Sequence, residues 1–109
     1  MKISFRDKKL RQLCEVEKAA QRKLGAICAR KLRTRLSDLE VASQVSELIA
    51  GNPHPLRGDR EGQFALNLSG GSRLVFSPDQ DPCPKTVDGA IDWAKVTSVC
   101  IEFIGDYHD

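Results

Sequence analysis

The sequence predicts an α+β fold in which N-terminal helices pack on an antiparallel β-sheet. Two observations support this prediction. Apolar residues recur at helical spacing up to about residue 50, and strand-type alternation dominates only after Gly62. Chains with helices first and strands afterwards typically place the helices on one face of an antiparallel sheet. With 109 residues, the chain is expected to form a single domain spanning 1–109.

The N-terminal segment alternates polar and apolar residues over 2–5, which predicts a short strand. Ser4, followed three residues later by Asp7, resembles a capping box, so a helix is expected to follow. The buried stripe of that helix is expected at the spacing i, i+3, i+4, in Leu10, Leu13 and Cys14.

A second, longer helix is predicted over 18–39, because apolar residues repeat there every four positions, at Leu24, Cys28, Leu32 and Leu36. The opposite face of this helix is basic and contains Arg22, Arg30 and Arg33. A third, short helix is predicted over 43–50 and ends at Gly51. Its expected N-cap is Ser43, and its expected inward residues are Val45, Leu48 and Ile49.

Strand periodicity follows in the second half of the chain. Alternation from Phe64, the Gly70-Gly71 turn and the apolar run after Arg73 predict a β-hairpin over 63–77. The stretch 77–95 is rich in Pro, Asp and Gly, and is expected to be a long excursion with little regular structure. The last predicted strand spans 96–104, with Val99, Ile101 and Phe103 on one side.

Charge is distributed unevenly along the chain. The net charge is only +2, but Lys and Arg are concentrated in residues 2–35. This asymmetry fits a polyanionic partner, although charge runs are more often solvated helix faces. No window approaches the roughly 20 apolar residues of a membrane span, and residues 1–20 contain no apolar run. A cytoplasmic protein without membrane association is therefore expected.

The four cysteines form no C-x-x-C pair, and their spacing matches no common zinc pattern, so no metal site and no cofactor are predicted. Cys14, Cys28 and Cys100 are interpreted as small core residues in a reducing compartment. Cys83 lies between two prolines and is expected to be exposed.

Residues 54–64 and the end of the chain hold both histidines and the only tyrosine, namely His54, Tyr107 and His108. Histidine exchanges protons near neutral pH, and arginines such as Arg57, Arg60 and Arg73 are suited to phosphate. The sequence lacks a clustered carboxylate set for Mg²⁺, a phosphate-binding G-x-x-x-x-G-K-[ST] loop and a nucleophile elbow.

RNA is a substrate that needs neither a metal ion nor a protein nucleophile, because its own 2′-OH can attack the adjacent phosphate. The enzyme then needs one base, one acid and a cation that stabilises the charge developing on the phosphate. Each residue taken alone has a simpler reading. A lone histidine is more often structural than catalytic, and the G-D-R-E-G segment alone is a polar turn into a strand.

The joint pattern resembles a known family. N-x-H-P-L-R-G-D-R-E-G-Q-F, a hairpin with S-R-L-V-F and a final strand ending I-x-D-Y-H are similar to the HigB-type toxins, or plasmid-maintenance killer proteins, of the RelE/ParE superfamily. The resemblance spans nearly the whole chain. It implies a curved antiparallel sheet and ribosome-dependent endonucleolytic cleavage of mRNA. It also implies a helix-turn-helix, HigA-like antitoxin as partner, in addition to the ribosome.

The resemblance also implies roles for individual residues. The catalytic candidates that it implies are His54, Arg73, Asp106, Tyr107 and His108. Proton transfer is assigned to His54 and His108, without deciding which is the base. Arg73 is expected to stabilise the transition state, Tyr107 to position the nucleotide and Asp106 to orient a neighbour. The RNA-binding candidates are Arg57, Arg60, Arg22, Arg30 and Arg33.

Two alternatives remain open on sequence grounds. The same fold is used by ParE-type inhibitors of DNA gyrase, which need no histidine constellation. A protein that has lost toxicity and only binds its cognate regulator is the other alternative. The sequence also departs from the family pattern, because 77–95 is longer than in the simplest members and Gly71-Ser72 replaces an aromatic residue before Arg73.

Overall fold

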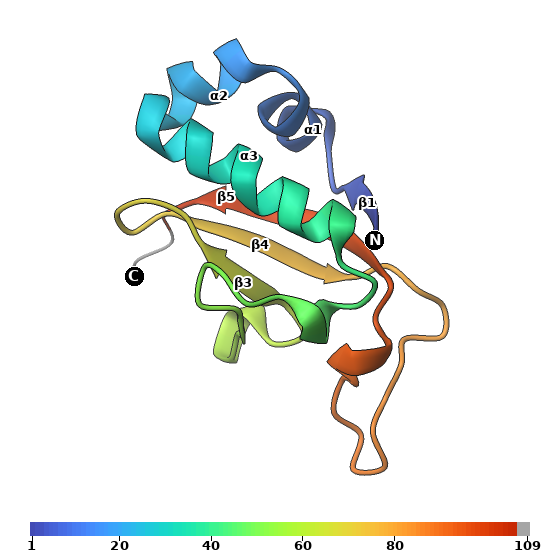
Figure 1. Cartoon of the computed structure of the whole chain (residues 1–109). Coiled ribbons are helices and arrows are strands. Elements are labelled where there is room, and N and C mark those ends of the chain that lie inside the picture. Colours follow the sequence, from blue (N-terminus) through green and yellow to red (C-terminus); the bar gives the residue numbers. More distant parts are fainter. Residues whose placement is uncertain (107–109) are drawn as a thin grey trace.

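Three helices cover one face of a five-stranded sheet in the computed structural model, which describes residues 1–106 (Figure 1). The helices are α1 (Lys8–Glu15), α2 (Glu17–Leu24) and α3 (Ala26–Val41). The strands are β1 (Lys2–Phe5), β2 (His54–Pro55), β3 (Phe64–Asn67), β4 (Arg73–Pro78) and β5 (Ser98–Gly105). Three short 3₁₀ turns are η1 (Val45–Glu47), η2 (Gly58–Arg60) and η3 (Trp93–Lys95).

The predicted α+β class is confirmed, and the sheet is mixed rather than wholly antiparallel. The strand order is β1-β5-β4-β3-β2. The four strands from β2 to β5 pair antiparallel, including the predicted hairpin of β3 and β4. The N-terminal strand β1 adds to the edge of β5 in parallel, with Phe5 opposite Ile101. The first and last strands of the chain are therefore neighbours.

The prediction of one long helix over 18–39 is wrong. Two helices occupy this stretch, and Gly25 separates them with φ +86° and ψ 160°. This backbone conformation is accessible to glycine and strained for other residues. The four-residue apolar repeat continues across Gly25, which is why periodicity alone indicated a single helix.

Replacing Gly25 with Ala is expected to destabilise the fold by about 1–3 kcal/mol. A Cβ at this position would meet no atom within 4 Å, so the cost would come from the backbone and not from a clash. Urea unfolding measures the effect as a lower midpoint with an unchanged slope. A variant as stable as the parent would show that the turn does not require the observed conformation.

Two further local predictions need correction. Asp7, not Ser4, caps α1, because its carboxylate accepts a hydrogen bond from Leu10 N at 2.9 Å. The Ser4 hydroxyl instead donates to the Asp79 carboxylate at 2.7 Å. The helix predicted over 43–50 is reduced to the single turn η1, and Ile49 is 90% exposed rather than inward.

The reason for the short turn lies in its neighbours. Val45 is fully buried, and its N–H donates to Val96 O at 3.1 Å, which fixes the turn against the end of η3, just before β5. Beyond it, Gly51 O accepts from Asn67 N at 2.6 Å, so the chain is already running beside β3. These contacts leave no room for a longer helix.

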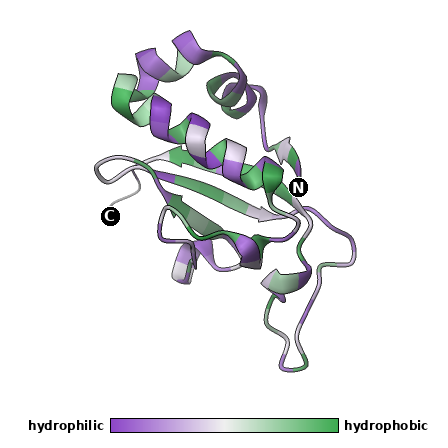
Figure 2. Ribbon diagram, viewed as in Figure 1, coloured by the Kyte–Doolittle hydropathy of each residue, from purple (hydrophilic) through white to green (hydrophobic). Residues whose placement is uncertain are grey.

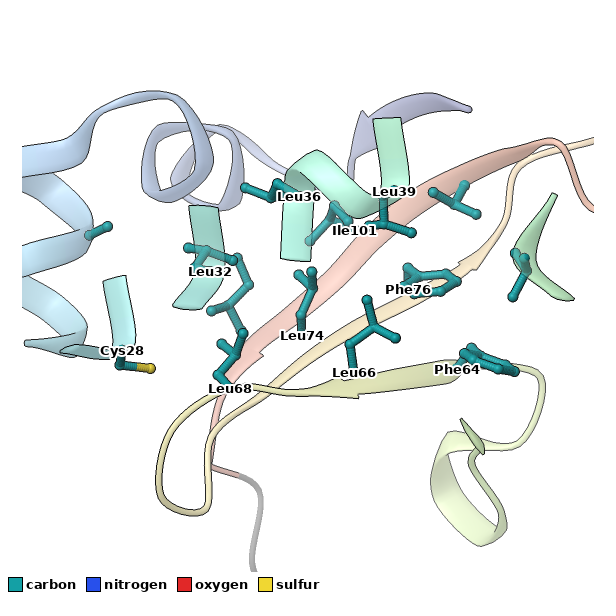
Figure 3. Packing of buried hydrophobic residues seen from close by; sticks show 14 of the residues in the cluster. Cys28, Leu32, Leu36, Leu39, Phe64, Leu66, Leu68, Leu74, Phe76 and Ile101 are labelled. Atoms are coloured by element: carbon teal, nitrogen blue, oxygen red, sulfur yellow. The ribbon is translucent and has the colours of Figure 1, made fainter. Parts of the chain in front are cut away.

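The core lies between the helices and the sheet. Green, hydrophobic segments of the ribbon face one another across this interface in Figure 2. In the close-up, Leu32, Leu36 and Leu39 of α3 stand over the strands (Figure 3). The sheet residues that meet them include Leu66, Leu74, Phe76 and Ile101, all with no exposed surface. Residues 64 and 66 therefore face the helices, and residue 65 faces away.

The four cysteines are free thiols. Cys28 is buried in the core and Cys14 is half-buried against it, as predicted. The prediction of Cys100 as a core residue is wrong, because Cys100 lies between the core residues Val99 and Ile101 and faces away from the helices. Cys83 is half-buried rather than fully exposed. Burial, with a smaller contribution from Glu15, raises the pKa of Cys14 to about 12. Burial likewise raises the pKa of Cys100.

Iodoacetamide at pH 8 is therefore expected to alkylate Cys14 about a hundredfold or more slowly in the folded protein than in the unfolded chain. The thiolate is the reactive form, and a raised pKa lowers its fraction at any pH below that pKa. Mass spectrometry of timed samples measures the rate at each cysteine, with the guanidinium-unfolded protein as reference. Equal rates at Cys14 in the folded and unfolded protein would contradict this expectation.

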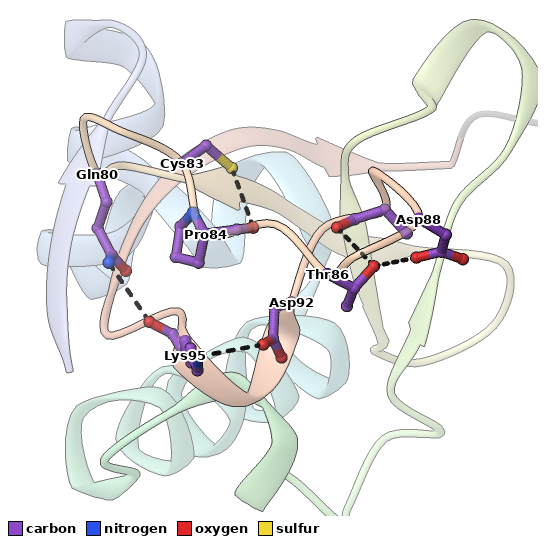
Figure 4. Close-up of polar contacts among 8 residues, drawn as sticks. Gln80, Cys83, Pro84, Thr86, Asp88, Asp92 and Lys95 are labelled. Carbon is purple, nitrogen blue, oxygen red and sulfur yellow. Dashed lines mark hydrogen bonds and ion pairs between the residues drawn. The ribbon is translucent and has the colours of Figure 1, made fainter.

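The predicted excursion forms a narrow extension, which we call the arm (residues 79–97, Figure 4). Its two sides are linked by Thr86 N to Ala90 O at 2.7 Å and by Asp92 N to Pro84 O at 2.9 Å. At its tip, the Thr86 hydroxyl donates to the Asp88 carboxylate and holds the pKa of that carboxyl below its usual value. Backbone contacts therefore give the arm a defined shape without long helices or strands.

No helix within residues 1–106 is both long enough and apolar enough to cross a membrane.

Candidate active site

The face of the sheet away from the helices, here called the open face, carries two of the predicted catalytic residues, His54 and Arg73. In the antiparallel part of the sheet, His54 pairs with Ala65, Ala65 with Val75, and Val75 with Phe103. Directly opposite residues of neighbouring strands point to the same face. Because Ala65 faces away from the helices, His54 does so as well.

His54 is half-buried, and a backbone contact orients its ring. Its Nδ1 lies 2.7 Å from Asn52 O. A carbonyl oxygen only accepts hydrogen bonds, so we assign the proton of the neutral ring to Nδ1. Nε2 then carries the lone pair, which is the form required of a general base.

Arg73 lies on the same open face. It is two residues before Val75 in β4, and β4 is two strands away from β2, which carries His54. It is paired with Asn67 on one side and with Gly105 on the other. Strand spacing and rise place its Cα roughly 12 Å from that of His54. Its Nη1 donates to Ser72 O at 3.2 Å, and the side chain is half-buried. An arginine and an imidazole at this separation can contact one nucleotide from two sides.

The loop between β2 and β3 adds two more predicted cations beside the open face. The Arg60 guanidinium lies 4.5 Å above the Phe103 ring, and its Nη1 donates to Gln63 Oε1 at 3.2 Å. Arg57 precedes the η2 turn and is exposed. These cation–π and polar contacts hold the Arg60 side chain over the sheet.

A cleft of about 710 Å³ lies along this loop, and we call it the arginine cleft. Its lining combines three arginines, Arg6, Arg57 and Arg60, with one carboxylate, Asp59. Arginine side chains bind phosphate with paired N–H donors, and they retain their charge at any physiological pH. The excess of positive charge fits an anionic ligand.

Sequence reasoning missed Arg6 and Phe103. Arg6 reaches the cleft because its N–H donates to Ile101 O at 3.0 Å, which extends the parallel pairing of β1 with β5. Phe103 was expected on the same side as Val99 and Ile101. A register shift between Val75 and Phe76 instead places Phe103 on the open face. Neither the parallel edge nor the bulge leaves a local sequence signal.

The C-terminal part of the predicted site is described only up to Asp106. Gly105 pairs with Arg73, and the exposed Asp106 follows it directly. The chain therefore leaves the sheet beside Arg73. Tyr107 and His108 lie outside the described residues, so their predicted roles remain predictions.

The three helical arginines lie elsewhere. Arg22 is on α2, Arg30 and Arg33 are on α3, and all three are exposed on the helical layer, which covers the opposite face of the sheet (Figure 1). Arg33 forms an ion pair with the carboxylate of Glu17. The predicted RNA-binding residues are therefore divided between two surfaces. Within residues 1–106, no group of three or more His, Cys, Asp or Glu residues is placed to hold a metal ion.

Comparisons with known proteins give structural likenesses only. No family model and no curated protein matches the sequence. A YoeB/ParE toxin from Agrobacterium tumefaciens superposes with a TM-score of 0.60 at 12% identity, over 99% of this chain and 100% of that one. A YoeB–YefM complex from Staphylococcus aureus gives a TM-score of 0.60 at 14% identity, over 100% and 98%. A YoeB dimer from the same species gives 0.58 at 15%, over 100% and 98%.

The chain has the fold of the YoeB/ParE-type toxins.

At such low identity, the YoeB/ParE-type fold is shared, but no individual site residue is transferred by the comparison. The narrower HigB-type resemblance therefore rests on the sequence motifs alone. The sheet of this YoeB/ParE-type fold nevertheless brings His54, Arg73 and Gly105, the last residue of β5, onto one face. His54 and Arg73, which are distant in the chain, thus lie on the same face of the sheet.

Proposed function

We propose that this protein is the toxin of a type II toxin–antitoxin module and acts as an endoribonuclease on translated mRNA at the ribosome. The observation that supports this most directly is the position of His54. Its ring is oriented by Asn52 O, it shares the open face with Arg73, and its loop leads into the arginine cleft. The YoeB/ParE-type fold supports the toxin part of the proposal.

In the proposed mechanism, the RNA supplies its own nucleophile. A base removes the 2′-OH proton, the O2′–P bond forms and the P–O5′ bond breaks. An acid gives a proton to the leaving 5′ oxygen. The products are a 2′,3′-cyclic phosphate and a 5′-OH. We assign the two proton transfers to His54 and His108, because imidazole is the side chain best matched to both near neutral pH.

The remaining residues bind and stabilise charge. Arg73 contributes its guanidinium to the phosphate as negative charge develops on the phosphate oxygens. Arg57 and Arg60 hold flanking phosphates in the arginine cleft. Tyr107 positions the nucleotide, and Asp106, next to Gly105 and Arg73, orients a neighbouring side chain.

The proposal includes a protein partner. One similar structure is the heterotetrameric YoeB–YefM toxin–antitoxin complex from S. aureus. By analogy, an antitoxin would neutralise this protein in the cytoplasm, and the HigB-type motifs favour one of the helix-turn-helix, HigA-like kind. The exposed arginines of α2 and α3 offer a surface to ribosomal RNA or to an acidic antitoxin surface.

The test is a brief induction of the protein in a bacterial host, followed by primer-extension mapping of 5′ ends on one message. The same message with its start codon destroyed serves as control. New ends that appear only on the translated message are expected. Growth arrest without new ends would overturn the nuclease assignment and favour a gyrase inhibitor. Absence of both would favour a non-toxic binding module.

A further inference from the structure

A second cleft, of about 690 Å³, lies between the arm and the β2–β3 loop. We call it the arm cleft. One wall is the loop, with Leu56, Arg57 and Glu61, and the other is the arm, with Lys85, Ile91 and Trp93. Leu56, Arg57 and Gln63 also line the arginine cleft. The two clefts therefore adjoin along a shared wall.

The arm cleft combines positive charge with apolar surface. Arg57 and Lys85 outnumber the single carboxylate, Glu61. Trp93 is half-buried, and its ring lies 4.8 Å from that of Phe64, so the indole is held in place by the core. A cationic groove with a fixed aromatic wall is the combination that binds single-stranded nucleic acid, with phosphates on the cations and bases against the ring.

The arm is anchored well enough to serve as a wall. Gln80 links its two ends, because its Oε1 accepts from Thr97 N at 2.5 Å. Its Nε2 also donates to Lys95 O at 3.4 Å (Figure 4). Lys85 and Ile91 are joined by a β-bridge across the arm. Lys85 and Trp93 therefore face the loop from a preformed structure, which reduces the entropy cost of ligand binding.

We propose that the arm cleft binds nucleotides that flank the cleavage site on the same RNA strand. Lys85 contacts a phosphate there and Trp93 contacts a base, while Arg57 spans the boundary between the two clefts. This inference rests on the proposed function and extends it, because it assigns a binding role to the 79–97 segment. The shared wall favours one continuous RNA strand over a separate ligand.

Trp93 is the only tryptophan in the chain, so its fluorescence reports directly on the arm cleft. The experiment uses 2′-O-methyl RNA oligonucleotides, which cannot undergo 2′-OH attack, with lengths of about three and about ten nucleotides at low salt. Fluorescence anisotropy of labelled oligonucleotides measures total binding. We expect both lengths to bind, and only the longer one to quench Trp93.

Two lysine variants provide the matched comparison. Lys85→Ala is expected to weaken binding of the long oligonucleotide by roughly tenfold and to leave the short one unchanged. Lys95→Ala is the control, because Lys95 is also an arm lysine, has a 75% exposed side chain and lies 4.0 Å from Asp92, outside the lining of both clefts. It is expected to bind both oligonucleotides as the parent does.

The outcomes separate the two proposals. Suppose that the short oligonucleotide binds, that the longer one binds no more tightly and does not quench Trp93, and that Lys85→Ala leaves both affinities unchanged. The arm cleft proposal is then overturned, while the proposed function stands. If Lys95→Ala weakens binding of the long oligonucleotide as much as Lys85→Ala does, the loss reflects the net charge of the protein and not a contact in the arm cleft. The assignment of Lys85 to RNA binding in the arm cleft then also fails. If neither oligonucleotide binds at low salt, the result counts against both proposals.

Discussion

Replacing His54 with Asn is expected to lower the rate of mRNA cleavage by roughly 10²–10⁴-fold, the usual contribution of a positioned acid or base. The Asn amide can still donate to Asn52 O, as Nδ1 does in the parent at 2.7 Å. It has no group that exchanges protons near neutral pH. The substitution therefore removes proton transfer while retaining the local hydrogen bond.

The measurement is the yield of new 5′ ends at fixed times after induction, at matched protein levels. Urea unfolding of the purified variant is the control, and stability within about 1 kcal/mol of the parent is expected, since the hydrogen bond is retained. His54→Gln is a useful second variant, because its longer side chain does not reproduce the Nδ1 position. Cleavage by a stable Asn variant at near-parental rate would rule out His54 as an acid or base.

Replacing Arg73 with Ala is expected to lower the cleavage rate by roughly 10²–10³-fold. Arg73 lies on the open face between Asn67 and Gly105, beside the point where the C-terminal segment leaves the sheet. Its guanidinium would stabilise the extra negative charge of the transition state, which exists only during the reaction. The loss should therefore appear in kcat more than in KM.

Arg73→Lys tests the nature of that contribution. Lysine keeps the charge but lacks the planar pair of donors, so an intermediate rate is expected. Steady-state kinetics in a purified translation system separate kcat from KM. If the Ala variant changed KM alone, Arg73 would be a binding residue and not a stabiliser of the transition state.

The order of helices and strands could be predicted from apolar periodicity, and its errors have identifiable causes. Gly25 interrupts a repeat that continues on both sides of it, because backbone conformation and apolar spacing are independent properties. The parallel pairing of β1 with β5 joins residues nearly a full chain length apart, and no local pattern encodes that register. The bulge that turns Phe103 to the open face is equally invisible to a simple alternation rule.

The candidate site was predictable to a similar extent. His54 and Arg73 could be selected by their chemistry and motif, and the structure places them on one face of the sheet. Arg6 could not be selected, because it reaches the arginine cleft only through the unpredicted β1–β5 edge. The defined shape of the arm could not be predicted from the sequence, because contacts such as that of Gln80 with Thr97 join residues that follow no regular spacing. The assignments of Tyr107 and His108 still depend on the motif alone.

The chemical identity of the cleaved ends tests the central claim most directly. Cleavage by the 2′-OH leaves a 2′,3′-cyclic phosphate, or the 3′-phosphate formed from it, and a 5′-OH. Mass spectrometry of fragments from a short message cleaved in a purified translation system would identify these groups. A message with a single 2′-deoxynucleotide at the mapped position should remain intact there. Products with a 3′-OH and a 5′-phosphate, or cleavage of the deoxy-substituted message at that position, would contradict the account.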